Sequence, residues 1–383
     1  MLLAQHERRI PLSLLCVLGL TFLIGCTSKP NRFGIIFVLD NEVAGTSDIY
    51  RIPDNTKNKL ERLTYTPNVG EYHLLVSKNG GKIIFEAGPS DNNSLPEASE
   101  LAIEDFRHVY LLDASSKKLV DITNGLVKYA MVGDWFTMDW SPDQKQFAAT
   151  NGEGLELMNF DGTNKRDIPI PSLGENPNIM GIEWSPDGKK LALFIGYVPE
   201  SPQHHGIAML IYDLGSGKPI QLTDYQEGCY IAKWSPNSQQ VAATCGITFP
   251  YTDMVGPDTL RIFSIENPGQ PYEHLAVSTC RDPLWSPDGK QLAFECDKGN
   301  NQEGLFIINF DGSGLHEVKF GNLASPAFLR YPIWSPDGTQ IVFVAGTDYK
   351  HTNIYSVHPD GSNNHAITSQ SANYQVVSVY PVP

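Results

Sequence analysis

Short apolar runs alternate with polar positions down the whole chain, and one five-residue turn recurs between pairs of them. The turn reads Trp-Ser-Pro-Asp-Gly at 184–188, 285–289 and 334–338, with altered copies at 140–144 and 234–238 that end in Gln144 and Ser238. Proline presets φ for the second position of a type I turn, and glycine takes the left-handed position that restores strand pairing. Each copy predicts a β-hairpin. We expect the turns at Gln144 and Ser238 to be strained or of another type.

A second pair of short strands lies between successive hairpins, with an Asp-Gly turn at 161–162, 311–312 and 360–361. The repeat is therefore four strands long. From Asp143 the equivalent positions follow at steps of 44, 50, 51 and 49 residues. A period of about 40–50 residues with four strands per unit is typical of a β-propeller, in which each sheet is buried against the next. The tryptophan before each turn suits packing between such sheets.

The ends of the chain predict how the ring closes. Residues 34–39 resemble a second strand without its first, and residues 374–380 resemble a first strand without its partner. Six hairpins, including a weak one at Leu74 to Phe85, and this shared blade give seven. We predict an all-β propeller of seven four-stranded antiparallel blades, closed by pairing of the N- and C-terminal strands, with six blades as the alternative.

Residues 1–26 have the pattern of a bacterial lipoprotein signal. A short basic region precedes an apolar stretch at 10–24 that is short for a membrane span, and the segment ends at Cys26. This predicts lipidation of Cys26, an uncleaved anchor being the alternative. Residues 27–33 then form a tether and residues 34–383 a single propeller domain, located outside the cytoplasm and facing either the periplasm or the cell surface.

Four cysteines occupy equivalent positions in two adjacent repeats. In each repeat one stands five residues before the turn tryptophan and another eleven after it. If each tryptophan faces the glutamine six positions later, at Gln240 and Gln291, the two cysteines also face each other. Such positions are close enough for a disulfide, although free buried thiols are the alternative. The spacing predicts the bridges Cys229–Cys245 and Cys280–Cys296.

Loop lengths separate two faces of the expected ring. The tight turns share one face, and long connections such as 88–107, 124–135, 196–206 and 246–258 share the other. Residues 94–106 carry a helix signal that could form a lid or be a decorative loop. A ligand site is expected on the long-connection face. Five candidates stand four positions before a turn tryptophan, at the mouth of the channel: Phe136, Met180, Tyr230, Arg281 and Arg330. Tyr72 is the equivalent residue of the weak hairpin. These side chains could bind a carboxylated or sugar-like ligand or simply fill space.

Composition and motifs limit the partners and the kinds of catalysis that the sequence supports. The chain carries 28 basic and 43 acidic residues, a net charge of −15, which argues against a nucleic-acid partner. It has no G-x-S-x-G, H-E-x-x-H, P-loop or C-x-x-C motif, and adjacent His204 and His205 point apart in an extended chain. We therefore expect no catalytic residues, no metal and no cofactor.

The Trp-Ser-Pro-Asp-Gly-Lys hairpins followed by apolar strands resemble the TolB-like, WD-repeat-like propeller family over nearly all of the chain after residue 33. The resemblance implies the fold. TolB itself resembles a six-bladed ring preceded by an α/β domain, and dipeptidyl-peptidase-like proteases carry the same repeats with a hydrolase domain; neither extra domain is visible here.

Two functions remain: a lipid-anchored envelope protein that binds a protein or glycan, or a polysaccharide-active enzyme resembling oligogalacturonate lyase. We favour the binding protein.

Overall fold

The structure is a computed structural model. It describes residues 32–41, 46–55, 59–65, 69–89, 108–122, 138–150, 154–170, 179–196, 207–224, 228–246, 259–268, 271–300, 302–320, 326, 328–369 and 371–382. Arg32–Pro383 form one compact unit. Several sequence predictions lie outside the described residues: the lipidated Cys26 and its signal segment, the candidate Phe136, and the helix signal at 94–106.

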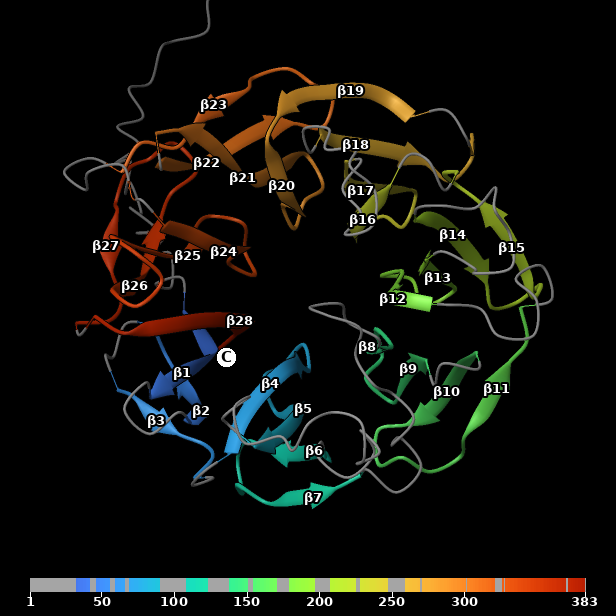
Figure 1. The fold of residues 1–383 in the computed structure, drawn as a ribbon, viewed down its shortest axis with the longest axis horizontal. Helices are drawn as coiled ribbons and strands as arrows, with labels where there is room; N and C mark the ends of the chain where they lie inside the picture. Colours follow the sequence, from blue (N-terminus) through green and yellow to red (C-terminus); the bar gives the residue numbers. More distant parts are fainter. Residues whose placement is uncertain are drawn as a thin grey trace, which may run out of the picture. The chain divides into compact units, whose positions relative to one another are not determined.

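The described chain forms seven four-stranded antiparallel sheets arranged in a ring, and contains no helix. Figure 1 shows one strand of each sheet around the centre and the others in order towards the rim. Blade 1 consists, from the centre outwards, of β28 (Asn373–Pro381), β1 (Phe33–Asn41), β2 (Thr46–Ile52) and β3 (Glu61–Arg62). The prediction of a seven-bladed propeller is confirmed.

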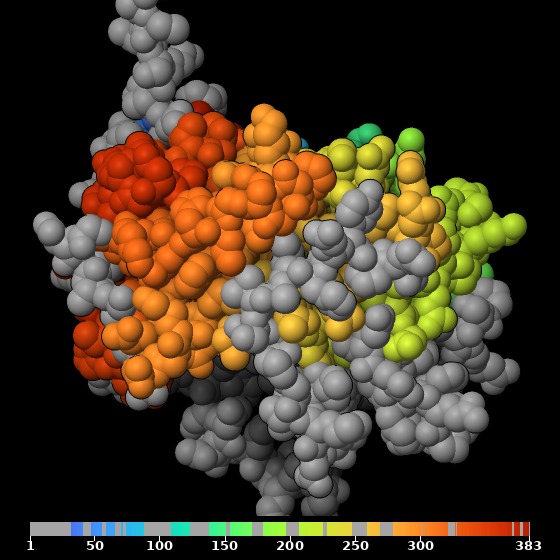
Figure 2. Space-filling view, turned by 90° about the horizontal axis from the view of Figure 1, so that it is seen from above, coloured from blue at the N-terminus to red at the C-terminus, as the bar shows by residue number. Residues whose placement is uncertain are grey.

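The other six blades follow in chain order, and in Figure 2 the colour of the described surface accordingly passes from red through orange and yellow to green across the molecule. Blade 2 contains β4 (Val69–Val76), β5 (Lys82–Pro89), β6 (His108–Asp113) and β7 (Leu119–Asp121), and blade 3 contains β8 (Met138–Trp140), β9 (Gln146–Thr150), β10 (Leu155–Asn159) and β11 (Arg166–Ile168). Blade 4 contains β12 (Ile179–Trp184), β13 (Lys190–Ile195), β14 (Ala208–Asp213) and β15 (Lys218–Gln221), and blade 5 contains β16 (Cys229–Trp234), β17 (Gln240–Cys245), β18 (Thr259–Ser264) and β19 (Pro271–Ser278). Blade 6 contains β20 (Cys280–Trp285), β21 (Gln291–Gly299), β22 (Gln302–Asn309) and β23 (His316–Glu317), and blade 7 contains β24 (Phe328–Trp334), β25 (Ile341–Gly346), β26 (Thr352–Val357) and β27 (His365–Ala366).

The recurring turn has the same hydrogen bonds with or without glycine. Gly188 N donates to Ser185 O at 2.8 Å, Gln144 N to Ser141 O at 2.8 Å, and Ser238 N to Ser235 O at 2.9 Å. Gln144 and Ser238 adopt φ of 60° and 59°. The altered copies are thus not another turn type, because both residues accept the left-handed conformation that the turn requires.

Four of the five turn tryptophans join their blade to the preceding one through the indole nitrogen, and Trp184 does so through its backbone N–H, which donates to Asp139. The indole Nε1 of Trp234 donates to Glu183 O at 3.1 Å, and that of Trp285 donates to Lys233 O at 2.9 Å. Trp140 and Trp334 make the equivalent bonds. Seven clusters of buried side chains occupy the seven interfaces between neighbouring blades. The core is therefore divided among the interfaces between sheets, as expected for stacked blades.

The first and last strands close the ring. β1 pairs with β28 from Phe33↔Pro381 to Asp40↔Asn373. Figure 1 shows β28, in red, lying on the inner side of the blue β1. The side chains add one bond, since Asn373 Nδ2 donates to Asp40 Oδ2 at 2.6 Å. The predicted closure by the chain ends is confirmed.

Both predicted disulfides are present, but the pairing assumed for the tryptophans was wrong by one residue. Cys229–Cys245 and Cys280–Cys296 are bonded, with Cα–Cα distances of 3.9 and 4.1 Å. Trp234 faces Val241 rather than Gln240, and Trp285 faces Leu292 rather than Gln291. A β-bulge between tryptophan and cysteine in each innermost strand shifts the register and brings the cysteines opposite each other.

The antiparallel order of each blade creates two distinct faces. Turns between first and second strands, and between third and fourth strands, lie on what we call the short-turn face; the remaining connections lie on the long-connection face. Neighbouring turns touch one another: a Cβ on Gly188 would lie 3.7 Å from Pro142, and one on Gly289 would lie 3.5 Å from Pro236. The turns of successive blades thus form a continuous surface.

Candidate functional site

The candidate positions before each tryptophan lie on the innermost strands. Met180 is buried in β12, and Tyr230, Arg281 and Arg330 are half-buried in β16, β20 and β24. Tyr72 lies in β4 and pairs with Glu86 along the backbone, but its side chain is outside the described part of the chain. The structure therefore brings the two arginines into adjacent blades and leaves the rest of the expected aromatic ring untested.

A β-bulge follows the candidate position in five innermost strands. The register shifts directly after Tyr72, Tyr230, Arg281 and Arg330, and between Ile179 and Gly181. The next residue has a left-handed φ at three of these bulges: 46° at Ile231, 56° at Asp282 and 58° at Tyr331. Bulges redirect side chains and are common beside binding sites. Here they reverse the side-chain alternation between the turn and the candidate residue.

Two of these bulges are held by the second strand of the preceding blade. Asp282 N donates to Thr244 Oγ1 at 3.2 Å, and Tyr331 N donates to Glu295 Oε1 at 2.9 Å. An amide displaced from its own ladder needs another acceptor when it is buried. Asp282 and Tyr331 are therefore fixed by contacts between blades.

Arg281 and Arg330 meet at two glutamates. Arg281 Nη2 lies 3.0 Å from Glu303 Oε1, and Arg330 Nη1 also pairs with that oxygen. Glu295 Oε2 lies 3.5 Å from Arg281 Nε and 3.5 Å from Arg330 Nη1. We call these four residues the arginine–glutamate cluster. An incoming carboxylate would have to compete with two glutamates for the same guanidinium groups.

Burial dominates the electrostatics of Glu295, whose side chain is only 1% exposed. Burial raises its pKa to about 8, and the negative charges of Asp282 and Glu303 act in the same direction, while the two arginines oppose them. The protonated form of this carboxyl group is therefore more favoured than in an exposed glutamate.

A second set of charged residues occupies the position directly before the turn tryptophan in three successive blades. Asp139 lies in β8, Glu183 in β12 and Lys233 in β16. Asp139 accepts the backbone N–H of Trp140 at 2.8 Å and of Trp184 at 2.6 Å, and Lys233 Nζ lies 2.7 Å from Glu183 Oε2. We call Asp139, Glu183 and Lys233 the axial triad. In the other described tryptophan hairpins this position holds Leu284 or Ile333.

The axial triad also has shifted pKa values. Enclosure by the surrounding blades raises the pKa of Asp139 to about 7, and the charge of Glu183 adds to the shift. Enclosure also raises the pKa of Glu183, although Lys233 opposes it. Enclosure alone would lower the pKa of Lys233, but the carboxylates of Glu183 and Asp139 outweigh it and raise that pKa.

Sequence reasoning missed five of these charged residues: Asp139, Glu183, Lys233, Glu295 and Glu303. Three of them could have been found, because they precede the turn tryptophan in consecutive repeats. Glu295 and Glu303 lie on the second and third strands of blade 6, and no local motif marks either. Their contact with the arginines depends on register and bulges.

The described residues show no grouping of three or more histidine, cysteine, aspartate or glutamate side chains that could hold a metal. In the same part of the chain, no helix has the length and apolar character needed to cross a membrane. The charged residues around the ring instead neutralise one another or accept backbone amides. This arrangement holds neighbouring blades together.

Comparison with known proteins gives a family and a fold. The family model "TolB beta propeller domain" matches residues 143–381. TolB from Acinetobacter baumannii is 13% identical, with a TM-score of 0.51 over 90% of this chain and 65% of that one. The chain thus spans slightly less than two thirds of that TolB.

Enzymes share the fold as well. Oligogalacturonate lyase from Vibrio parahaemolyticus is 13% identical, with a TM-score of 0.55 over 88% of this chain and 84% of the lyase. A structure from a study of two prolyl endopeptidases is 12% identical, with a TM-score of 0.59 over 90% of this chain and 48% of that protein. At these identities the likeness concerns the fold alone. Because the family model covers more than half of the sequence, the chain belongs to the TolB β-propeller family.

Proposed function

We propose that this protein is a lipid-anchored binding or scaffold protein of the bacterial cell envelope, held to the membrane through Cys26. Its long-connection face would recognise an envelope protein or a glycan. The two disulfides support an extracytoplasmic location, because such bonds persist in oxidising compartments. Membership of the TolB β-propeller family supports a role in binding at the envelope.

The mutual pairing of the charged residues in the arginine–glutamate cluster is the observation that carries the proposal. Arg281 and Arg330 are the cationic groups that a polysaccharide-active enzyme would need for acidic sugars, and both are paired with Glu303 and Glu295. Glu303 Oε2 also accepts Leu329 N at 2.6 Å, which ties β22 to β24. The cluster therefore acts as a joint between blades 6 and 7.

The long-connection face is the natural place for recognition. Its connections vary most in length between blades, whereas the short turns are nearly uniform. The described part of this face includes Tyr349, in the connection between β25 and β26, whose side chain is 54% exposed. Exposed tyrosines are common at protein and glycan contacts because they combine an apolar ring with a polar group.

The test places a photo-crosslinking phenylalanine analogue at Tyr349 in the full chain, in cells. The matched control places it at Phe310, which is 46% exposed in a turn of the short-turn face. We expect one discrete adduct with an envelope protein or glycan from position 349 and none of the same mass from position 310. Absence of an adduct at 349, or the same adduct at both positions, would contradict recognition on the long-connection face.

A further inference from the structure

The short-turn face is basic over one half of the ring. In the turns of blades 2, 3 and 4, six exposed lysines stand against three aspartates, Asp143, Asp161 and Asp187. In the turns of blades 5, 6 and 7, the only lysine is Lys290, and it stands among five acidic residues. The lysines of the basic half are Lys78, Lys117, Lys118, Lys145, Lys165 and Lys189.

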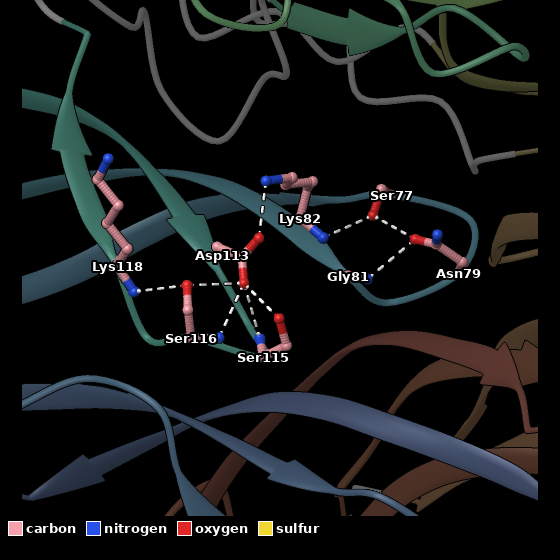
Figure 3. A network of polar contacts seen from close by, with 8 residues as sticks. All are labelled: Ser77, Asn79, Gly81, Lys82, Asp113, Ser115, Ser116 and Lys118. Atoms are coloured by element: carbon pink, nitrogen blue, oxygen red, sulfur yellow. Dashed lines mark hydrogen bonds and ion pairs between the residues drawn. The ribbon is translucent and has the colours of Figure 1, made fainter.

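The carboxylates in these turns and beside them are engaged in local contacts. Figure 3 shows this for Asp113, at the end of β6: its Oδ1 accepts bonds from the amides and hydroxyls of Ser115 and Ser116, and its Oδ2 accepts Lys82 Nζ at 2.8 Å. These contacts hold the pKa of Asp113 far below its usual range. In the same view the Lys118 side chain does not reach this network; only its backbone amide does.

Apolar side chains lie among the lysines. Leu119 and Val120 follow Lys118 directly and are 41% and 40% exposed, and Phe160, in the turn of blade 3, is 38% exposed. Lys82 Nζ lies 5.9 Å from the centre of the Phe160 ring, which places the ring next to the turns of blade 2. Lysines with exposed leucine, valine and phenylalanine are typical of surfaces that sit at the headgroup level of a membrane.

The acidic residues of the chain are concentrated elsewhere in the sequence. The three longest connections between second and third strands, residues 90–107, 196–207 and 246–258, contain eight acidic residues and one arginine. The acidic excess behind the net charge of −15 therefore lies outside the turns of blades 2 to 4. An anionic membrane surface would attract the basic half.

The N-terminal end of the ring lies on the short-turn face. A Cβ on Gly80, in the first turn of blade 2, would lie 2.7 Å from the ring of Tyr380, and Tyr380 pairs with Gly34. Arg32 bonds to Asp54, between β2 and β3, and its carbonyl accepts Val382 N. Arg32, the first described residue, therefore lies on the same face as the basic turns of blade 2.

We infer that the turns of blades 2 to 4 form a docking surface for a layer of anionic lipid headgroups. The basic turns, the exposed apolar residues and the start of the domain all lie on the same face. Docking there would orient the ring with its short turns on the membrane and its long connections towards the envelope space. The inference is independent of what the long-connection face recognises.

The test measures co-sedimentation of residues 32–383 with vesicles of phosphatidylcholine, with and without phosphatidylglycerol. This fragment contains all seven sheets and both strands that close the ring. We expect binding to the anionic vesicles only, weakening as salt is raised. The variant K78Q/K118Q/K145Q should bind roughly a hundredfold more weakly, at about fivefold per lysine.

The matched control removes three lysines outside the basic half, in the variant K290Q/K319Q/K350Q, and should change binding by no more than about twofold. Equal losses in both variants would show a net-charge effect and overturn the assignment of the surface. Undiminished binding by the first variant, or equal binding to neutral vesicles, would overturn it as well. Inorganic phosphate at constant ionic strength should not compete; competition would indicate a small phosphate site instead of a lipid surface.

Discussion

Left-handed backbone positions show how a repeat tolerates the loss of its glycine. Gly188, Gly289 and Gly338 have φ of 72°, and Gln144 and Ser238 keep nearly the same value in the altered turns. A side chain in this conformation costs about 1 kcal/mol because its Cβ crowds the following carbonyl. The surrounding hairpin is evidently stable enough to impose it.

Replacing Gln144 with glycine should therefore raise the free energy of unfolding by about 1 kcal/mol. The matched variant is Ser238→Gly, which relieves the same strain but removes the hydroxyl that accepts Asp187 N at 3.0 Å. Its gain should be smaller or absent. Urea unfolding of both variants measures the difference, and a loss of stability in Gln144→Gly would contradict the argument.

Glu295 makes stability depend on pH. Its pKa is about 8 in the folded protein against 4.5 for an ordinary glutamate, so between these values the unfolded chain releases a proton that the folded one retains. Its contribution to stability is complete below pH 4.5 and is lost as the pH rises to about 8, at up to about 1.4 kcal/mol per pH unit. Asp139, with a pKa of about 7, acts in the same direction.

Glu295→Gln should flatten this dependence and leave the variant more stable than the native protein at pH 8. Unfolding free energies measured from pH 5 to 8 test it. The control is Glu317→Gln: the ion pairs of Glu317 with Lys298 and Lys319 lower its pKa, so its contribution falls only in acid. An unchanged slope in Glu295→Gln would show that the carboxyl group is already ionised at neutral pH.

At the scale of the strand, the innermost strands of blades 4 to 7 each combine a predictable turn with an unpredictable bulge. The turns could be predicted, because proline, aspartate and glycine each impose a known backbone conformation. The bulges could not, since the residues at φ 46°, 56° and 58° are Ile231, Asp282 and Tyr331, which share no chemistry. The disulfides were predicted correctly because the cysteines lie on the far side of each bulge, where one extra residue restores the assumed pairing.

Each disulfide connects residues 16 apart in sequence. Closing a loop of this length in the unfolded chain corresponds to about 3 kcal/mol of stability. Replacing Cys229 and Cys245 by alanine should lower the unfolding free energy by about that amount, and the equivalent change at Cys280 and Cys296 should cost a similar amount. Guanidinium unfolding with and without reductant measures both. A reductant effect that persists when all four cysteines are replaced would exclude the disulfides as its cause.

For the whole molecule, the repeated turn in five blades and the incomplete repeats at the two chain ends were sufficient to predict seven blades and their closure. Ligand binding at the candidate residues stays a prediction. Arg281 and Arg330 lie on neighbouring innermost strands, as expected, but their partners Glu295 and Glu303 come from β21 and β22, the second and third strands of blade 6. The register between the strands decides which side chains meet there, because a shift of one residue moves every side chain of a strand to the opposite face of the sheet.

The pairing of β1 with β28 also sets an order of events during biosynthesis. Asp40 and Asn373, which bond across this pair, are 333 residues apart. A chain that is made and exported from its N-terminus must keep the inner edge of β1 open until its last strand arrives. Such an edge is a template for pairing with other chains. The protein therefore passes through a stage in which the other strands of the ring have been made and the inner edge of β1 is still unpaired. At that stage a chaperone or an early membrane attachment would protect this edge from pairing with other chains.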